Sequence, residues 1–338
     1  MQIRRIEGAL REAYADFLRR RPEALVYQSL PYQDLLCAML GVRNESVAAC
    51  DADGMIHGAL PLLASDGPWG TVYNSLPFYG SNGGLLTDTP PAREALLTWY
   101  NTLSLAPSTA SATIIANPLL DDGTVNGVTH NRLDSRIGQF SPLNSDAQRQ
   151  MEGFHYKTRN MIRKAEKSGV SVTVENDAID FLRAVHLENM AALGGIPKPA
   201  GFFDLFPSFF AEDSHYRIYV ARINGERVAA LLLFYFNSTV EYFIPVIQKD
   251  YRDQQPMSLL VYTAMLEAAR SGYSWWNWGG TWHTQEGVYR FKSRWGTIDR
   301  PYNYYIQLNR IELENHPRAE ILAAHPFFYV LPFAAKAA

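Results

Sequence analysis

The pattern of hydrophobic and polar positions predicts two similar β-hairpins, one in each half of the chain. Residues 47–65 place apolar stretches on both sides of Asp53-Gly54, and residues 218–236 do the same around Asn224-Gly225. Asp-Gly and Asn-Gly between apolar stretches are strong signals of a hairpin turn. The pattern therefore predicts an antiparallel pair of strands at each place.

The elements after each hairpin follow one order, which is a strand, a helix and a further strand. The predicted ranges are 70–75, 91–105 and 111–118 after the first hairpin, and 239–245, 257–271 and 275–280 after the second. The two copies are offset by about 165–170 residues, and self-similarity at a fixed offset indicates a repeated structural unit. We therefore predict two copies of one α/β module.

A polar, turn-rich stretch over residues 138–151 predicts the place where the two modules join. The expected organisation is an N-terminal domain over 1–140, a C-terminal domain over 141–310 and an extension over 311–338. The end of this extension is apolar but contains Pro326 and Pro332. It either packs on a domain or makes a peripheral contact with a membrane surface.

Composition limits the classes of partner. The chain has 338 residues, 47% of them hydrophobic and 19% charged, with a net charge of −3. No broad positive field is available to bind long nucleic acid, so we expect no DNA partner. Cys37 and Cys50 match no metal or disulfide pattern, which favours a reducing, cytoplasmic setting.

The most apolar stretch, residues 228–247, has the length of a membrane span. It contains Glu241, Pro245 and the turn signal Asn237-Ser238. Two buried strands explain this composition better, and no transmembrane span is expected.

A basic helix is predicted to begin near residue 156 and to end at Gly169. At 100° per residue, Tyr156, Arg159 and Arg163 lie near one face. Two interpretations stay open. The helix presents a solvated basic face, or the two arginines form a fork for a phosphate or carboxylate of the acceptor, with Tyr156 beside them.

Several segments resemble the Fem family of peptidoglycan-bridge aminoacyltransferases and the FemAB-like acetyltransferase domains of envelope-polysaccharide loci. The resemblance covers roughly residues 25–308, and its most specific piece is GVYRFKSRWG. The other matching segments are KTRNMIRKAEKSG, ENMAALGGIPKP, LLVYTAMLEAARSGYSWWNWGG, GALPLL and NSLPFYGSNGG. The resemblance implies two tandem GNAT-like domains with mixed, mostly antiparallel sheets. It further implies a ligand cleft between them and chemistry in the second.

The resemblance also implies a catalytic centre around the pair Phe291-Lys292. In the family, this lysine stabilises the negative charge that develops during acyl transfer, and such a donor must be aimed at that charge. Gly279-Gly280 would let the backbone approach a ligand closely. Glu241, in the central strand, and His283, past the glycines, are the candidate bases. A structural role stays open for Lys292, Glu241 and His283.

Two loops are expected to hold the substrates. Arg252, Gln254 and Ser258 are the candidate donor-binding residues in QKDYRDQQPMS, which lacks the glycines of a usual pyrophosphate loop. The donor is therefore open between acetyl-CoA and an aminoacyl-tRNA, with no tightly bound cofactor and no metal. In the first half, NSLPFYGSNGG either forms a simple turn or binds a sugar or pyrophosphate of the acceptor. Its candidate residues are Asn74, Ser75, Tyr79, Gly80 and Gly83.

The leading function is an N-acyltransferase that acts on an amine of a cell-envelope precursor, such as an amino sugar or a peptidoglycan peptide. The expected acceptor is a small or nucleotide-linked molecule. A Fem-type ligase that uses the acceptor end of an aminoacyl-tRNA is the alternative. A catalytically silent tandem-GNAT binding module is the third possibility.

Overall fold

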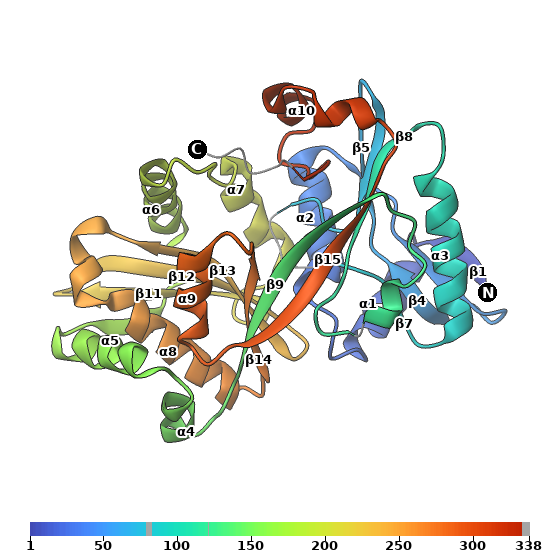
Figure 1. Cartoon of the computed structure of the whole chain (residues 1–338). Helices are drawn as coiled ribbons and strands as arrows, with labels where there is room; N and C mark the ends of the chain where they lie inside the picture. The colour runs from blue at the N-terminus through green and yellow to red at the C-terminus, as the bar shows by residue number, and fades with distance from the viewer. Residues whose placement is uncertain (79–82, 121, 333–338) are drawn as a thin grey trace. The chain divides into compact units, whose positions relative to one another are not determined.

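The two predicted runs of strands and helices fall in separate units of the computed structural model, which describes residues 1–78, 83–120 and 122–332 (Figure 1). Unit 1 comprises Met1–Ile137 and Pro301–Ala338, and unit 2 comprises Gly138–Arg300. Two strands, β9 (Arg132–Pro142) and β15 (Ile298–Leu308), each carry residues of both units.

Unit 1 contains short strands and three helices of ten residues or more among its described residues. Its helices are α1 (Leu10–Arg19), α2 (Leu30–Leu40), α3 (Pro90–Ser104) and α10 (Arg318–Ala324), with short 3₁₀ turns at Val26–Gln28, Asp122–Val125 and Ile311–Glu314. Its strands are β1 (Gln2–Arg5), β2 (Arg43–Asn44), β3 (Val47–Cys50), β4 (Ile56–Leu60), β5 (Leu63–Gly67), β6 (Gly70–Asn74), β7 (Leu86–Thr87) and β8 (Thr109–Ile115).

The first predicted hairpin is present, but its second strand is divided. β3 and β4 pair antiparallel, as predicted. β4 ends at Leu60, and after Pro61 the chain continues as β5, which pairs with β6 instead. Proline has no N–H to donate to a ladder, so it separates the expected strand into two. β4 therefore belongs to a sheet in the order β1-β3-β4-β7, while β5 lies next to β6 and β2.

Unit 2 has a regular order of longer elements. Its helices are α4 (Ala147–Glu152), α5 (Tyr156–Lys167), α6 (Ile179–Ala192), α7 (Ala200–Phe209), α8 (Pro256–Arg270) and α9 (Glu286–Ser293), with a 3₁₀ helix, η3, at Lys249–Gln254. Its strands are β10 (Ser171–Val174), β11 (Tyr216–Ile223), β12 (Glu226–Phe236), β13 (Thr239–Ile247) and β14 (Trp275–Thr281).

The second predicted hairpin and its turn are confirmed. β11 and β12 pair antiparallel, and both turn residues have positive φ, 52° at Asn224 and 84° at Gly225. Positive φ at both central residues defines the turn that Asn-Gly favours. The strands of unit 2 then run in the order β10-β11-β12-β13-β14, and all of these pairs are antiparallel except β13 with β14.

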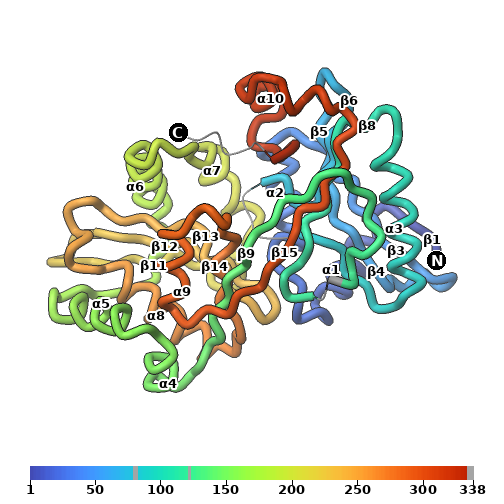
Figure 2. Tube along the Cα trace, in the orientation of Figure 1, coloured from blue at the N-terminus to red at the C-terminus, as the bar shows by residue number. Residues whose placement is uncertain are grey.

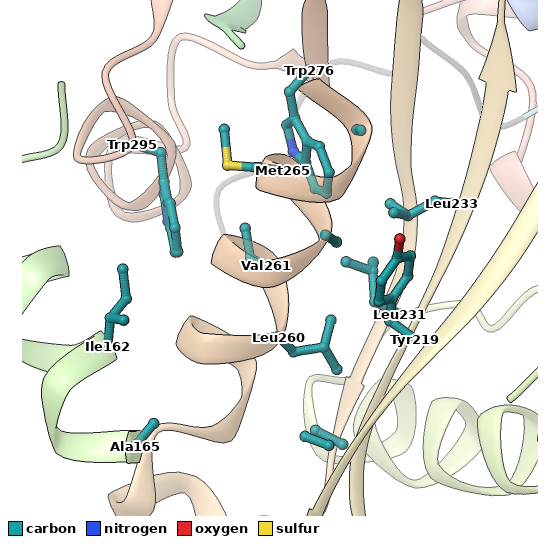
Figure 3. Close-up of a cluster of buried hydrophobic side chains, with 14 of the residues drawn as sticks. Ile162, Ala165, Tyr219, Leu231, Leu233, Leu260, Val261, Met265, Trp276 and Trp295 are labelled. Carbon is teal, nitrogen blue, oxygen red and sulfur yellow. The ribbon is translucent and has the colours of Figure 1, made fainter. Parts of the chain in front are cut away.

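Helices cover both faces of the unit 2 sheet, with α5 and α8 on one side and α6 and α7 on the other (Figures 1 and 2). The first side buries an apolar core that includes Ile162 of α5, Val261 of α8 and strand residues such as Leu231 (Figure 3). The second side is aromatic, because Phe202 of α7 stacks on Phe243 of β13 with ring centroids 5.5 Å apart. This double cover explains why β12 is buried over most of its length. The two buried strands predicted for residues 228–247 are thus present.

The end of the chain is grouped with unit 1, which differs from the predicted domain ranges of 141–310 and 311–338. The reason is pairing of the C-terminal part of β15 with β8, where Tyr304 lies opposite Ile115. Further along, the Ser65 hydroxyl and Nδ1 of His325 are 2.8 Å apart. The mixed α/β class with mostly antiparallel sheets is as predicted. Within the described residues, no helix has both the length and the apolar character needed to span a bilayer.

Candidate active site

The central strands of unit 2 part from each other halfway along. β13 and β14 are joined by three parallel pairs, which are Thr239 with Trp275, Val240 with Trp276 and Glu241 with Asn277. β13 continues to Ile247 and β14 to Thr281, and among the described residues no further pair joins them. We call residues 242–247 and 278–281 the separated strand ends. The backbone N–H and C=O groups of one end form no ladder hydrogen bonds with those of the other end. A ligand can therefore bind to these groups.

The corresponding strands of unit 1 stay together. β6 and β8 pair in parallel as far as Asn74 with Thr113. Beyond that pair, Ser75 N donates to Thr113 O at 3.0 Å, and Ile115 N donates to the Ser75 hydroxyl at 2.9 Å. The separation needed to admit a ligand between strands is therefore present in unit 2 and absent from the described part of unit 1.

Lys292 lies at the end of β14 and is buried. It belongs to α9, and 7% of its surface is exposed. Its Nζ donates to Thr281 Oγ1 at 2.8 Å and to the carbonyl oxygens of Gly279 and Gly280 at 3.3 Å each. All three of these partners come from the separated strand ends. The side chain predicted to carry the catalytic charge is thus held against β14.

Burial changes the titration of Lys292. Loss of hydration disfavours the ammonium form, and this lowers the pKa of Lys292 to about 8. Thr281 Oγ1, which accepts from Lys292, donates in turn to Gln139 Oε1 at 3.1 Å. A short polar chain therefore fixes the place of the ammonium. The sequence pattern did not reveal this chain, because Gln139 falls in a stretch interpreted as a linker.

The aromatic residues next to Lys292 in sequence and in β14 pack against one another. Trp278 and Trp295 are buried, with ring centroids 5.5 Å apart. Phe291 packs edge-on against Trp278 at 5.9 Å and is 37% exposed. Phe291 thus presents a partly exposed ring beside the buried lysine. Gly279 has a φ of +75°, a conformation that favours glycine, so the glycine is needed for the backbone itself.

The two candidate bases have different positions. Glu241 is 1% exposed and pairs with Asn277 in the last pair before β13 and β14 separate. On the other edge of β13 it pairs with Phe234 of β12. His283 is exposed in the loop between β14 and α9. The structure therefore places Glu241, and not His283, in the interior next to the separated strand ends.

The two arginines of the candidate fork on α5 have different contacts. Arg159 Nη1 donates to the carbonyl oxygens of Glu152 at 3.4 Å and Phe154 at 3.1 Å, so it holds the connection between α4 and α5. Arg163 is exposed, and Tyr156 is 55% exposed. Arg163 and Tyr156 keep accessible side chains, whereas the Arg159 side chain is directed at the protein's own backbone.

The candidate donor loop is compact. η3 leads into α8 through Gln255, which has a φ of +60°, and Pro256 is the first helical residue. Ser258 is 5% exposed, and its backbone N–H donates to Gln255 O at 3.0 Å. Arg252 is exposed, while the buried Oε1 of Gln254 has no hydrogen-bond partner in the described structure. Arg252 and Gln254 thus remain available to a ligand.

The candidate acceptor loop of unit 1 is engaged internally where the structure describes it. Asn74 is fully buried and donates through Nδ2 to Tyr329 O at 3.1 Å, and the Ser75 hydroxyl accepts from Ile115 N. A Cβ on Gly83 would lie 2.8 Å from Ser75 O. Tyr79 and Gly80 lie outside the described residues. These contacts assign Asn74, Ser75 and Gly83 to packing within unit 1.

Comparison with known proteins agrees with this geometry. Residues 153–293 match the model of the acetyltransferase (GNAT) domain family. The chain shares its fold with the crystal structure of FemX, at a TM-score of 0.74 and 14% identity over 93% of this chain and 99% of that one. No curated protein sequence matches the chain.

Two further structures share the fold. The C-terminal domain of a putative lysylphosphatidylglycerol synthetase from Agrobacterium fabrum has a TM-score of 0.59 and 14% identity, over 92% of this chain and 96% of that one. A tandem GNAT protein from the clavulanic acid biosynthesis pathway has a TM-score of 0.50 and 11% identity, over 90% and 98%. The matched range contains α5, the separated strand ends and Lys292. Residues 153–293 of unit 2 therefore carry a GNAT-type acetyltransferase domain.

Proposed function

We propose that unit 2 is an N-acyltransferase that transfers an acetyl or aminoacyl group to an amine of a cell-envelope precursor, such as an amino sugar or a peptidoglycan peptide. The observation that carries the proposal is the separation of β13 and β14 beside the buried Lys292. Unpaired strand edges offer N–H and C=O groups to an acyl donor, and Lys292 offers a positive charge at the same place.

Lys292 has the chemistry that the reaction requires. Attack by an amine places negative charge on the carbonyl oxygen, and a fixed cationic donor stabilises that charge. With a pKa of about 8, Lys292 is mostly ammonium at pH 7. Its two bonds of 3.3 Å to Gly279 and Gly280 are beyond the usual range for N–H···O, so an N–H can turn towards substrate at small cost.

The envelope acceptor rests on two supports. One is the sequence resemblance to the Fem family, and the other is the fold shared with FemX. Phe291, partly exposed beside Lys292, provides a ring on which a sugar face or an apolar side chain can pack. We place Arg163 and Tyr156 of α5 as further candidate contacts for the acceptor.

The structure of the donor loop favours an aminoacyl-tRNA-dependent ligase as the second candidate. A coenzyme A pyrophosphate needs free N–H groups at the start of a helix. At the start of α8, Pro256 has no N–H, and the Ser258 N–H is already bonded to Gln255 O. Acetyl-CoA would then depend on side chains such as Arg252 and Gln254, whereas an aminoacyl ester requires no pyrophosphate site.

The test compares donors on the purified full-length chain. Acetyl-CoA and alanyl-tRNA are each supplied with glucosamine or with a lysine-containing UDP-muramoyl pentapeptide, and amide products are measured by mass spectrometry. We expect one donor to give product, and Lys292→Ala to lower kcat by about 10²–10³. Lys164→Ala, an exposed lysine on α5, is the matched control. No product from any pair, or full activity in Lys292→Ala, would contradict the proposal.

A further inference from the structure

A second buried lysine, Lys198, lies on the side of the unit 2 sheet that α6 and α7 cover. It belongs to the connection between α6 and α7, and 8% of its surface is exposed. Its Nζ is 4.9 Å from the centroid of the Phe243 ring. A lysine that can reach water normally does so, because ammonium hydration is strongly favourable. A buried head group in a connecting segment therefore needs an explanation.

Phe243 fixes where Lys198 lies along β13. It is two residues past Glu241, the last residue of β13 that pairs with β14. In the register with β12, Leu233 lies opposite Tyr242 and Leu232 opposite Ile244, so Phe243 is an extra, bulged residue. Lys198 therefore covers the separated end of β13, as Lys292 covers that of β14.

The position of Lys198 is fixed from α6. His186 Nε2 accepts a hydrogen bond from the Lys198 backbone N–H at 3.1 Å. Asn189 Nδ2 donates to Ile247 O at 3.0 Å, and Ile247 N donates to Asn189 Oδ1 at 3.1 Å. These two hydrogen bonds hold α6 against the end of β13. Burial, together with the charge of Lys198, lowers the pKa of His186 to about 4, so His186 is a neutral acceptor at physiological pH.

We infer that Lys198 is the proton acceptor of the transfer reaction, receiving the proton that the acceptor amine loses as it attacks the acyl carbonyl at the separated strand ends. This inference rests on the proposed function. It gives the two buried lysines different tasks, with Lys292 as the cation on the β14 side and Lys198 as the base on the β13 side.

The protonation states agree with this division. Burial lowers the pKa of Lys198 to about 7, against about 8 for Lys292. A neutral Lys198 amine is therefore accessible near neutral pH, while the higher pKa of Lys292 favours its ammonium form. Two titratable groups whose environments separate their pKa values are typical of an acid–base pair. Ionisable groups on the elements around Lys198 include Asp180, His186 and Glu188 of α6, the ion pair of Arg183 with Asp204 of α7, and Glu241 of β13.

The reaction balances with one proton moved. The nitrogen lone pair of the neutral acceptor forms the C–N bond, and the carbonyl π electrons move to oxygen, where Lys292 lies. Lys198 takes a proton from the nitrogen, which has become cationic. When the oxyanion collapses, the bond to sulfur or to the ester oxygen breaks, and Lys198 returns the proton to that leaving group.

A purely structural role makes a different prediction. If Lys198 serves only to place a positive charge over Phe243, it can be replaced by arginine, which keeps the cation–π contact. Arginine cannot act as a base near neutral pH. The pair Lys198→Arg and Lys198→Met therefore separates the two roles, with Lys167→Arg, on the exposed end of α5, as the control.

The experiment measures kcat and KM for whichever donor and acceptor probe gives product with wild type. We expect Lys198→Arg and Lys198→Met to lower kcat by about 100-fold with acceptor KM within about threefold, because general-base loss typically costs this much. Log kcat/KM of the wild type should rise with pH through about 7, and this rise should be missing from Lys198→Arg. Melting curves identify a variant that fails to fold.

A second measurement needs no substrate. In protein labelled at lysine Cε, the resonance that disappears in Lys198→Arg should titrate near pH 7, and its titration should persist in Lys292→Met. A Lys198 that stays ammonium to pH 9 would overturn the inference, and so would a folded Lys198→Arg with wild-type kcat. Absence of product with wild type would overturn the proposed function first, and with it the role of Lys198.

Discussion

Lys292 Nζ and Thr281 Oγ1 are 2.8 Å apart, so the buried ammonium of α9 is hydrogen-bonded to the last residue of β14. The Thr281 hydroxyl in turn donates a hydrogen bond to Gln139 Oε1. Through this relationship, a helix that follows the strand controls where the positive charge lies at the end of the strand.

Thr281→Val should lower activity without unfolding unit 2. Valine has nearly the same shape but offers no oxygen to Lys292, so the ammonium loses its shortest bond while the buried packing is kept. We expect kcat to fall by roughly tenfold, in line with the loss of one hydrogen bond to a charged group. Thr281→Ser keeps the hydroxyl and serves as the control. Equal activity of the two variants would show that this bond does not position Lys292.

Stability should rise with pH in the range where Lys292 titrates. The pKa of Lys292 is lowered to about 8 in the folded chain from an ordinary value of 10.5, so the unfolded state binds more protons between those values. The free energy of unfolding therefore increases with pH from about 8 to 10.5, and the destabilisation is fully present below pH 8. Denaturant titrations at pH 7.5 and 9.5 should show a gain of order 1–2 kcal/mol in wild type relative to Lys292→Met. A difference independent of pH would contradict the lowered pKa.

Gly83→Val should destabilise unit 1 and not act selectively on acceptor binding. A Cβ at this position would lie 2.8 Å from Ser75 O and 3.0 Å from Leu76 Cβ, so the backbone must shift. We expect the free energy of unfolding to fall by about 1–3 kcal/mol, which is typical of overpacking. Gly123→Ala, where no atom lies within 4 Å of the added Cβ, is the matched control. An unchanged melting temperature with lost acceptor binding would instead restore this loop to the acceptor site.

Arg159 and Arg163 should behave differently when each is replaced by alanine. Arg159→Ala removes bonds to Glu152 O and Phe154 O, and we expect a loss of about 1 kcal/mol in unfolding free energy. Arg163→Ala should leave stability unchanged and raise the KM of a phosphorylated acceptor. Chemical denaturation and steady-state kinetics separate the two effects. An equal rise of KM in both variants would favour the arginine fork.

Local sequence signals predicted the turns of both hairpins and the strand, helix and strand that follow each, because apolar periodicity and turn dipeptides act over a few residues. Gly225 and its neighbour Asn224 illustrate this, since their positive φ values follow from the residues themselves. Lys292 was found through its motif. Thr281, the hydroxyl partner of Lys292, was not found, because nothing in the sequence distinguishes it from other strand residues.

The contacts that the sequence did not predict are those between segments far apart along the chain. Asn74 seemed a ligand contact because an amide near glycines suits a sugar, yet its Nδ2 donates to Tyr329 O, 255 positions away. The sequence predicted no role for Lys198, since no local pattern shows that a lysine will be buried over Phe243. Such assignments depend on segments that meet only after folding.

The hydroxyl of Ser75, which closes β6 onto β8, has a consequence for the history of the chain. If the two units descend from one duplicated ancestor, the Ser75 hydroxyl that accepts from Ile115 N and the Ser75 N–H that donates to Thr113 O together closed the ligand gap in one copy while its fold persisted. Mutation of that copy would then be constrained by folding alone, and its former binding surface could drift. Ser75→Ala, paired with small residues along β8, would be a starting point for restoring the lost gap by directed evolution.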